Sequence, residues 1–158
     1  MRTLGFRTHA LLALAAAVGV VAALARPWYA PAIPVEEAAD LDGPLYTLTD
    51  TIARWLGETT GATGWEALGS WGTALAAMAA LTAFGAFGCL VPALQGVARA
   101  AVRYASLGCL AIAAWKLFDS PGPNAALEPR HGAFVAALAA AIAVMAGSAV
   151  ASAPLRSR

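Results

Sequence analysis

The stretch GAFVAALAAAIAVMAGSAVASA, residues 132–153, decides the fold of this chain, because it contains no charged side chain and no histidine. A helix rises about 1.5 Å per residue and the hydrocarbon core of a bilayer is about 30 Å thick, so roughly 20 apolar residues make one crossing. The stretch meets that length. Alanine gains little on entering lipid, so we expect the stability of this span to come from close contact with other helices.

Three further stretches of low charge precede this one, and together they predict four membrane-spanning helices. The chain has 158 residues, of which 60% are hydrophobic and only 12% charged, with a mean hydropathy of +0.68. Soluble domains carry about a quarter charged residues, so this composition indicates a membrane protein. The predicted fold class is all-α, an integral membrane four-helix bundle in one domain, 1–158. Its spans are expected at about residues 8–26, 70–93, 100–118 and 132–153.

The distribution of basic residues predicts how the spans are threaded. Six arginines fall in the N-terminal tail, the second connection and the C-terminal tail, whereas four basic residues and every acidic residue fall in the other two connections. Basic residues in short segments mark the cytoplasmic side of a membrane. We therefore expect a multi-pass protein of the cell membrane, with both termini cytoplasmic and the loop 27–69 extracytoplasmic.

The first span has a second interpretation. Its basic start, its apolar stretch and the small residues Ala23-Leu24-Ala25 also fit a secretory signal peptide, and cleavage after Ala25 would leave three spans. Trp28 and Tyr29 are typical of interface residues that follow a retained span, and Pro27 lies close to the cleavage point. We therefore favour a retained anchor, and N-terminal sequencing of the mature protein decides between the two interpretations.

Part of the long extracytoplasmic loop has the pattern of a short amphipathic helix. Its apolar residues recur at helical spacing, with threonine and charged residues on the other face. They are Leu45, Leu48, Ile52, Trp55 and Leu56. With several acids nearby, attraction of this helix to anionic lipid is disfavoured, so we expect it to pack on the spans of the same protein.

The residues before the second span indicate a capped helix start. Thr63 stands three residues before Glu66, the capping-box spacing in which the threonine oxygen accepts a hydrogen bond from the glutamate N–H and the carboxylate accepts one from the threonine N–H. We expect the second helix to start near Gly64, above the membrane. Trp65 and Trp71 then lie near the outer headgroups.

The titratable residues match no catalytic or metal-binding motif. His9 and His131 fall on opposite sides of the predicted membrane, and the loop acids lack the pattern of a calcium site. Cys89 and Cys109 both lie in spans without zinc spacing, and a thiol pair at similar depth is the alternative to two buried apolar side chains. We expect no cofactor, no metal and no nucleic-acid partner, and we favour a protein that is not an enzyme.

Six residues are candidate contacts with lipid or with a protein partner. The tryptophans suit a membrane interface or the lining of a groove, and the glycines leave smooth helix faces that suit a second copy of the chain or another membrane protein. The candidates are Trp55, Trp65, Trp71, Gly85, Gly88 and Gly147. Leucine in place of these glycines is expected to break assembly.

The layout resembles a known group of proteins. Pro27-Trp28-Tyr29 after the first span, Trp65-Glu66-Ala67 before the second and the turn SPGPN at 120–124 resemble small four-span proteins of GC-rich bacterial genomes, for which no activity is established. The plan is also similar to claudin-like tetraspans, although the W-L-W-C-C pattern and the outer cysteine pair are absent. The resemblance implies a four-span architecture and no activity.

Two function classes follow. The first is a non-enzymatic scaffold or accessory subunit of a membrane complex. The second is a lipid-binding or small-molecule-binding protein, an enzyme included, with its site between the loop helix and the outer ends of the spans. Mass spectrometry of the gently isolated protein distinguishes a stoichiometric protein partner from a bound lipid.

Overall fold

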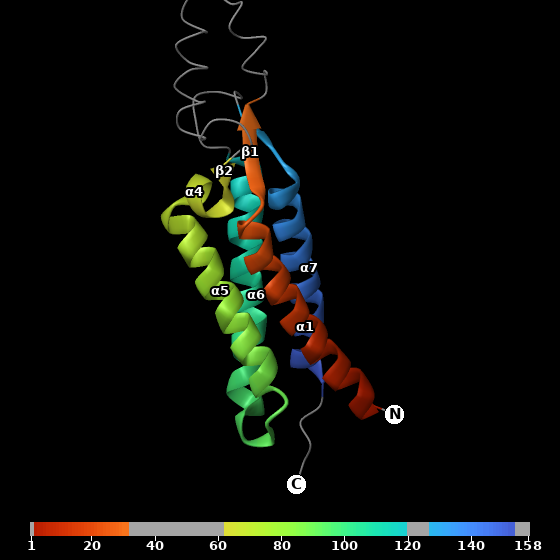
Figure 1. The fold of residues 1–158 in the computed structure, drawn as a ribbon. Coiled ribbons are helices and arrows are strands. Elements are labelled where there is room, and N and C mark those ends of the chain that lie inside the picture. Colours follow the sequence, from red (N-terminus) through yellow and green to blue (C-terminus); the bar gives the residue numbers. More distant parts are fainter. Residues whose placement is uncertain (1, 32–61, 120–126, 154–158) are drawn as a thin grey trace, which may run out of the picture.

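The computed structural model describes residues 2–31, 62–119 and 127–153, and these form a bundle of four long helices (Figure 1). The long helices are α1 (Arg2–Leu24), α5 (Ser70–Gly88), α6 (Gln95–Phe118) and α7 (His131–Ser152). Each belongs to a segment long and apolar enough to cross a membrane. The predicted all-α membrane four-helix bundle is confirmed. The amphipathic helix predicted around Trp55 lies outside the described residues.

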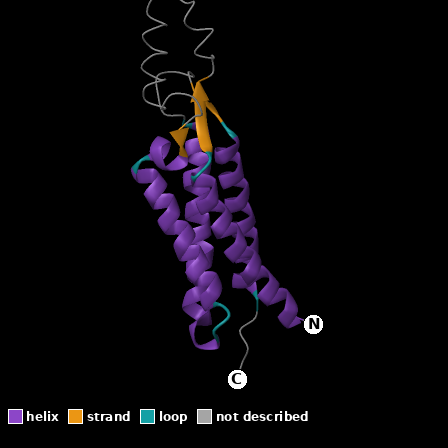
Figure 2. Ribbon diagram, in the orientation of Figure 1, coloured by secondary structure: helices purple, strands orange, loops and turns teal. Residues whose placement is uncertain are grey.

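The four helices alternate in direction, and each packs against its neighbours in the chain. α1 packs on α5, α5 on α6 and α6 on α7, and α7 closes the ring on α1. The start of α1, the α5–α6 connection and the end of α7 share one end of the bundle, called the terminal end below. The other end carries the short strands and is called the sheet end (Figure 2). α1 is therefore one wall of the bundle, held between two other helices.

The second long helix is shorter than the predicted span and the third begins earlier. α5 ends at Gly88 instead of near residue 93, and a short 3₁₀ helix, η1 (Pro92–Leu94), leads directly into α6. The segment from Pro92 to Phe118 has 27 residues. At about 1.5 Å per residue it is about 10 Å longer than a hydrocarbon core. Arg99 and Arg103 lie in the first turns of α6, near the start of this segment.

Small side chains let the helices approach closely. Val102 of α6 has no exposed surface and lies between α5 and α7. A Cβ added to Gly85 would stand 2.9 Å from Val102 Cγ2, and one added to Gly147 would stand 2.8 Å from Val102 Cγ1. Real side chains do not pack that tightly, so α6 fits between its neighbours only because both positions are glycine.

A three-stranded antiparallel sheet lies at the sheet end, and the sequence did not predict it. β1 (Pro27–Pro31) is the central strand, between β2 (Ala62–Thr63) and β3 (Leu127–Pro129). Pro27 and Pro31 at its two ends are compatible with an extended strand but not with the interior of a helix. Strands of five, two and three residues are too short to show an alternating pattern. The sheet joins the first connection between spans to the third.

The capping box at the sheet end is confirmed. The Thr63 N–H donates to Glu66 Oε2 at 3.0 Å, and the Glu66 N–H donates to Thr63 Oγ1 at 3.4 Å. The helix that they cap, α4 (Gly64–Leu68), is short and separate from α5. Gly69, with φ of +51°, turns the chain between them, a conformation that glycine adopts more readily than other residues.

Candidate functional site

Two of the predicted contact tryptophans lie exposed at the sheet end. Trp65 is on α4 and Trp71 on the first turn of α5, and their side chains are 43% and 49% exposed. Lys116 Nζ of α6 lies 5.7 Å from the centre of the Trp71 ring, a cation–π contact between neighbouring helices. Trp55, the third predicted tryptophan, lies outside the described residues. Both described rings therefore face away from the bundle interior.

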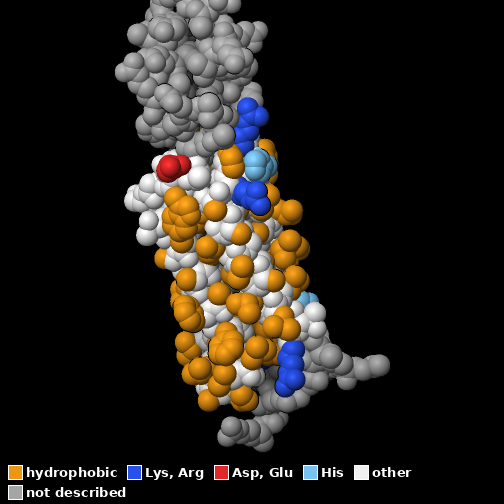
Figure 3. All heavy atoms as spheres, in the orientation of Figure 1, with side chains coloured by type: hydrophobic (Ala, Val, Ile, Leu, Met, Phe, Trp, Pro, Cys, Tyr) orange, Lys and Arg blue, Asp and Glu red, His pale blue; other side chains and the backbone are white. Residues whose placement is uncertain are grey.

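Two further aromatic residues share this end, and the sequence analysis did not select them. Trp115 and Phe118, in the last turn of α6, are 61% and 87% exposed. Exposed aromatic side chains near the ends of spans form the belt that marks the membrane–water interface. In Figure 3 the lysine and arginine side chains lie toward the two ends of the bundle, with an apolar surface between them. The sequence signal for these two residues is their place beside Lys116, at the end of a predicted span.

The end of α6 is closed by a small polar network. Asp119 Oδ2 accepts hydrogen bonds from Lys116 Nζ at 2.8 Å and from Trp115 Nε1 at 3.0 Å. The hydrogen bond and the positive charge of Lys116 hold the pKa of Asp119 below its usual value. The network orients Trp115 and Lys116 at the surface. It accounts for all three polar groups without a ligand.

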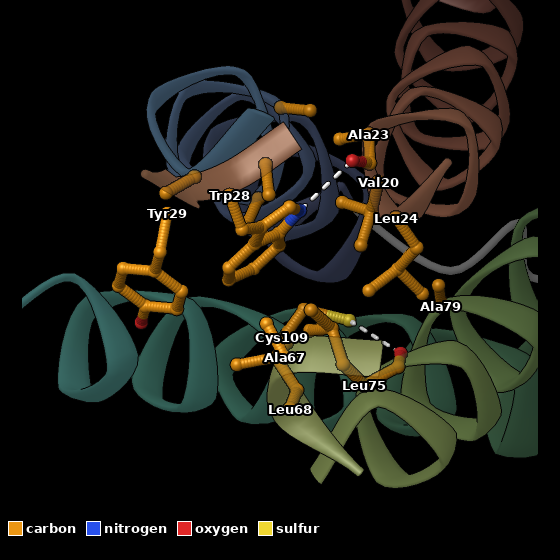
Figure 4. Close-up of a cluster of buried hydrophobic side chains, with 14 residues drawn as sticks. Val20, Ala23, Leu24, Trp28, Tyr29, Ala67, Leu68, Leu75, Ala79 and Cys109 are labelled. Carbon is orange, nitrogen blue, oxygen red and sulfur yellow. Dashed lines mark hydrogen bonds between the residues drawn. The ribbon is translucent and has the colours of Figure 1, made fainter. Parts of the chain in front are cut away.

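Trp28 is enclosed at the centre of the sheet end (Figure 4). Its side chain is 0% exposed and its Nε1 donates to the carbonyl of Ala23 at 2.8 Å. A Cβ added to Gly64 would stand 2.6 Å from Trp28 Nε1, and one added to Gly132 would stand 2.8 Å from its Cδ1. The ring is therefore held between the start of α4 and the start of α7. The interpretation of Trp28 as an interface residue was wrong, because two glycines leave room for it inside.

The interpretation of Tyr29 as an interface residue was also wrong, since its side chain is 0% exposed. Its hydroxyl donates to the backbone carbonyl of Lys116, which ties β1 to the last turn of α6. Burial, together with the negative charge of Asp119, raises the pKa of Tyr29 to about 12. Trp28 bonds to α1 and lies against α4 and α7, and Tyr29 bonds to α6, so this one strand fastens the four helices together.

The three predicted contact glycines all face α6 of the same chain. Gly85 and Gly147 border Val102, and a Cβ on Gly88 would stand 3.0 Å from Ala98 Cβ. Close approach within the bundle is thus a sufficient reason for each of them. Contact with a second protein through these positions stays a prediction.

The terminal end holds a groove that the sequence analysis did not select. It measures about 460 Å³, opens to the surface, and is lined by Gly96, Arg99, Ala100, Arg103, Tyr104, Ala151 and Ala153. Arg99 is 9% exposed, donates from Nη1 to the carbonyl of Ala153, and stacks on Phe6 with 5.1 Å between Cζ and the ring centre. The sequence did not predict this groove, because the burial of Arg99 beside the exposed Arg103 depends on the contact between α6 and α7.

The histidines and cysteines are not brought together. His9 lies near the terminal end, on α1, and His131 begins α7 at the sheet end. Cys109 Sγ lies 4.0 Å from the carbonyl of Leu75, while Cys89 follows α5 fourteen residues further along the same helix, about 21 Å away. The two thiols therefore form no pair. Among the described residues, no three His, Cys, Asp or Glu side chains gather in a way that could hold a metal ion.

Comparison with known proteins gives no relative from which a role could be transferred. No family model, no curated protein and no solved structure matches this chain. Its function is therefore inferred from the geometry of its own residues.

Proposed function

We propose that this chain is a non-enzymatic scaffold or accessory subunit of a membrane complex, which presents residues 32–61 to a protein partner outside the cytoplasm. One observation carries the proposal. The chain leaves the bundle at Pro31, at the end of β1, and returns at Ala62, at the start of the antiparallel partner β2. Residues 32–61 therefore start and finish at one base, made of two hydrogen-bonded strands.

That base is tied to the long helices α6 and α7 and to the short helix α4. β1 pairs with β3, which leads into α7, and Trp28 lies between the starts of α4 and α7. The Tyr29 hydroxyl holds the same strand to α6. The two points at which residues 32–61 leave and rejoin the described chain are therefore fixed on the bundle, which supports a role in holding a partner.

The charge of residues 32–61 supports a protein partner with a basic surface. The segment contains six acidic residues and only Arg54 as a basic one, a formal charge of 1 − 6 = −5. The acids are Glu36, Glu37, Asp40, Asp42, Asp50 and Glu58. Charges of one sign speed the encounter with an oppositely charged surface and select against acidic partners.

The polar side chains inside the bundle support a structural role. Thr82 Oγ1 donates to the carbonyl of Met78 at 2.9 Å, and Ser106 Oγ donates to the carbonyl of Arg103 at 3.1 Å. Trp28 and Tyr29 likewise donate to backbone carbonyls. Each of these groups is occupied by the chain itself, so none of the four stands ready to act on a ligand.

The test is a crosslinking experiment on intact membranes with a matched variant. The full chain and a variant carrying E36Q, E37Q, D40N and D42N are crosslinked, gently solubilised and examined by mass spectrometry. The proposal predicts a protein in stoichiometric amount with the unsubstituted chain and its loss from the variant. Equal thermal unfolding of the two chains in detergent shows that the fold is unchanged.

Two results contradict the proposal. One is a partner that binds both chains equally. The other is a tightly bound lipid or small molecule, without a protein, that is lost when Trp65 and Trp71 are replaced by alanine. The second result would instead support the lipid-handling class, with its site beside the exposed tryptophans of the sheet end.

A further inference from the structure

We propose that the groove between α6 and α7 at the terminal end binds the headgroup of an anionic phospholipid, through the guanidinium groups of Arg99 and Arg103. This site is at the opposite end from the segment discussed above, and the inference does not depend on the proposed scaffold role. It starts from a positive charge, that of Arg99, which has no counter-ion in the part of the chain that the structure describes.

Arg99 is nine-tenths buried, yet its positive charge has only weak partners. Nη1 donates to the carbonyl of Ala153 and one face of the guanidinium stacks on Phe6, while Nε has no hydrogen-bond partner among the described residues. Arginine stays charged in proteins, and a buried charge without a compensating ion is costly. The described acids, Glu66, Asp119 and Glu128, belong to the sheet end. The compensating negative charge has to come from outside the described chain.

The groove gives an anion access to a second arginine. Arg103 stands one helical turn after Arg99, so both side chains fall on the same face of α6, and both line the groove. Arg103 is exposed, whereas Arg99 forms the inner wall. Two guanidinium groups on one face match the several acceptor oxygens of a phosphate, to which arginine donates paired, charge-assisted hydrogen bonds.

The depth of the groove favours a lipid over a free anion. Arg99 and Arg103 lie four and eight residues after the start of α6, about 6 and 12 Å along it. The segment that contains them, Pro92–Phe118, exceeds the hydrocarbon thickness by about 10 Å, and the long side chain of an arginine carries its charge further toward the lipid phosphates than its own backbone. The other lining residues are Gly96, Ala100, Ala151 and Ala153, with the exposed ring of Tyr104 on the side toward the bundle centre. Small side chains leave room for a glycerophosphate, and an open side admits its acyl chains.

The experiment measures thermal unfolding of the full chain in neutral detergent by tryptophan fluorescence. The probes are phosphatidylglycerol, phosphatidylcholine with the same acyl chains, and inorganic phosphate. The proposal predicts a saturable rise in unfolding temperature with phosphatidylglycerol and none with the other two. R103Q, which changes an exposed residue, is expected to need about tenfold more phosphatidylglycerol for the same rise.

Two further variants complete the test. R7Q removes an exposed arginine at the same end of the bundle and is expected to respond like the unsubstituted chain. R99Q is expected to lose the response, and where it fails to fold, R103Q decides. The proposal is overturned if R103Q responds like R7Q, if phosphatidylcholine stabilises equally, or if inorganic phosphate alone produces the full rise, since that result describes a free-anion site.

Discussion

Two glycines decide whether Trp28 can occupy the interior of the sheet end. Gly64 and Gly132 approach the indole and the adjoining backbone so closely that a Cβ would stand 2.6 Å from Trp28 Nε1 and 2.6 Å from the Pro27 carbonyl oxygen, respectively. The neighbouring atoms are a buried ring and main chain, which cannot move away without disturbing the sheet. The enclosure of Trp28 is thus as much a property of these two positions as of the tryptophan.

The first prediction concerns these glycines. G64A and G132A should each lower the free energy of unfolding by about 1–3 kcal/mol, the usual effect of overpacking a core. G5A is the matched control, because a Cβ on Gly5 of α1 meets nothing within 4 Å. Denaturant unfolding in detergent measures the difference. Variants at 64 and 132 that are as stable as G5A would show that Trp28 is not held as described.

The second prediction concerns the pH dependence given by Tyr29. Burial raises its pKa to about 12, above the value of about 10 expected in the unfolded chain, so the folded state favours the protonated hydroxyl. The stabilisation is complete below pH 10 and is lost as the pH rises from about 10 to 12, with a total on the order of 2 kcal/mol. Y29F should abolish this loss, whereas Y104F, at an exposed position near the other end, should retain it. An unchanged profile in Y29F contradicts the assignment.

At the scale of single elements, α4 is a one-turn helix that depends on its cap. The Thr63 hydroxyl donates to Glu66 Oε2 at 2.8 Å, and the Thr63 N–H donates to the same oxygen. These two hydrogen bonds, the first above all, hold the pKa of Glu66 below its usual value. A carboxylate with a lowered pKa stabilises the folded state above its unfolded pKa and loses that effect as the pH falls through the folded value. The cap therefore weakens in acid.

The third prediction tests the cap. T63A should lower the stability by about 1 kcal/mol at neutral pH, the usual cost of removing an N-cap hydroxyl. The difference in the free energy of unfolding between T63A and the unsubstituted chain should become smaller as the pH falls through the range where Glu66 becomes protonated. S152A is a control, because the Ser152 hydroxyl bonds to a carbonyl at the far end of α7. A pH-independent effect of T63A would argue against the reciprocal bonds.

The fourth prediction concerns the packing of α6 between α5 and α7. G85L and G147L should destabilise the folded single chain, because leucine at either position meets Val102, which has no free space to enter. G96L should leave the stability unchanged, because a Cβ added to Gly96 of α6 meets nothing within 4 Å. Unfolding in detergent together with particle mass separates loss of fold from loss of assembly. Stable variants that only change oligomer size would instead assign these glycines to a partner contact.

Sequence patterns predicted the elements more fully than the contacts between them. The run at 132–153 needed only its length and lack of charge to indicate a span, and the Thr63–Glu66 spacing indicated a cap, because both depend on neighbours in the chain. The position of Trp28 depends on glycines at 64 and 132, which no local pattern connects to it. The Arg99–Arg103 groove likewise requires the end of α7 beside α6.

For the whole molecule, the short sheet and the small-residue core make α1 part of one unit with the other three helices. Val20, Ala23 and Leu24 of α1 are buried in the same cluster as Trp28, which lies just beyond Ala25. Removal of α1 would expose that cluster together with the inner faces of α5 and α7. Retention of α1 as an anchor stays a prediction, and N-terminal sequencing of the mature protein is its direct test.

The topology stays a prediction: we expect four helices to cross the membrane, with both ends of the chain in the cytoplasm. It is tested by labelling single cysteines in intact cells with a membrane-impermeant maleimide, after C89A and C109A remove the native thiols. One substitution is made near the span ends for each terminus and each connection: R7C, W65C, L94C, D119C and S152C. All five native residues lie at or near the ends of their helices.

In intact cells we expect labelling at positions 65 and 119 only, with positions 7, 94 and 152 reacting once the membrane is permeabilised. Labelling of 94 together with 65 would mean that α5 does not cross. Two results at position 7 would contradict the four-span topology with α1 as a wall of the bundle. One is the absence of residue 7 from the mature chain, and the other is labelling of that position in intact cells.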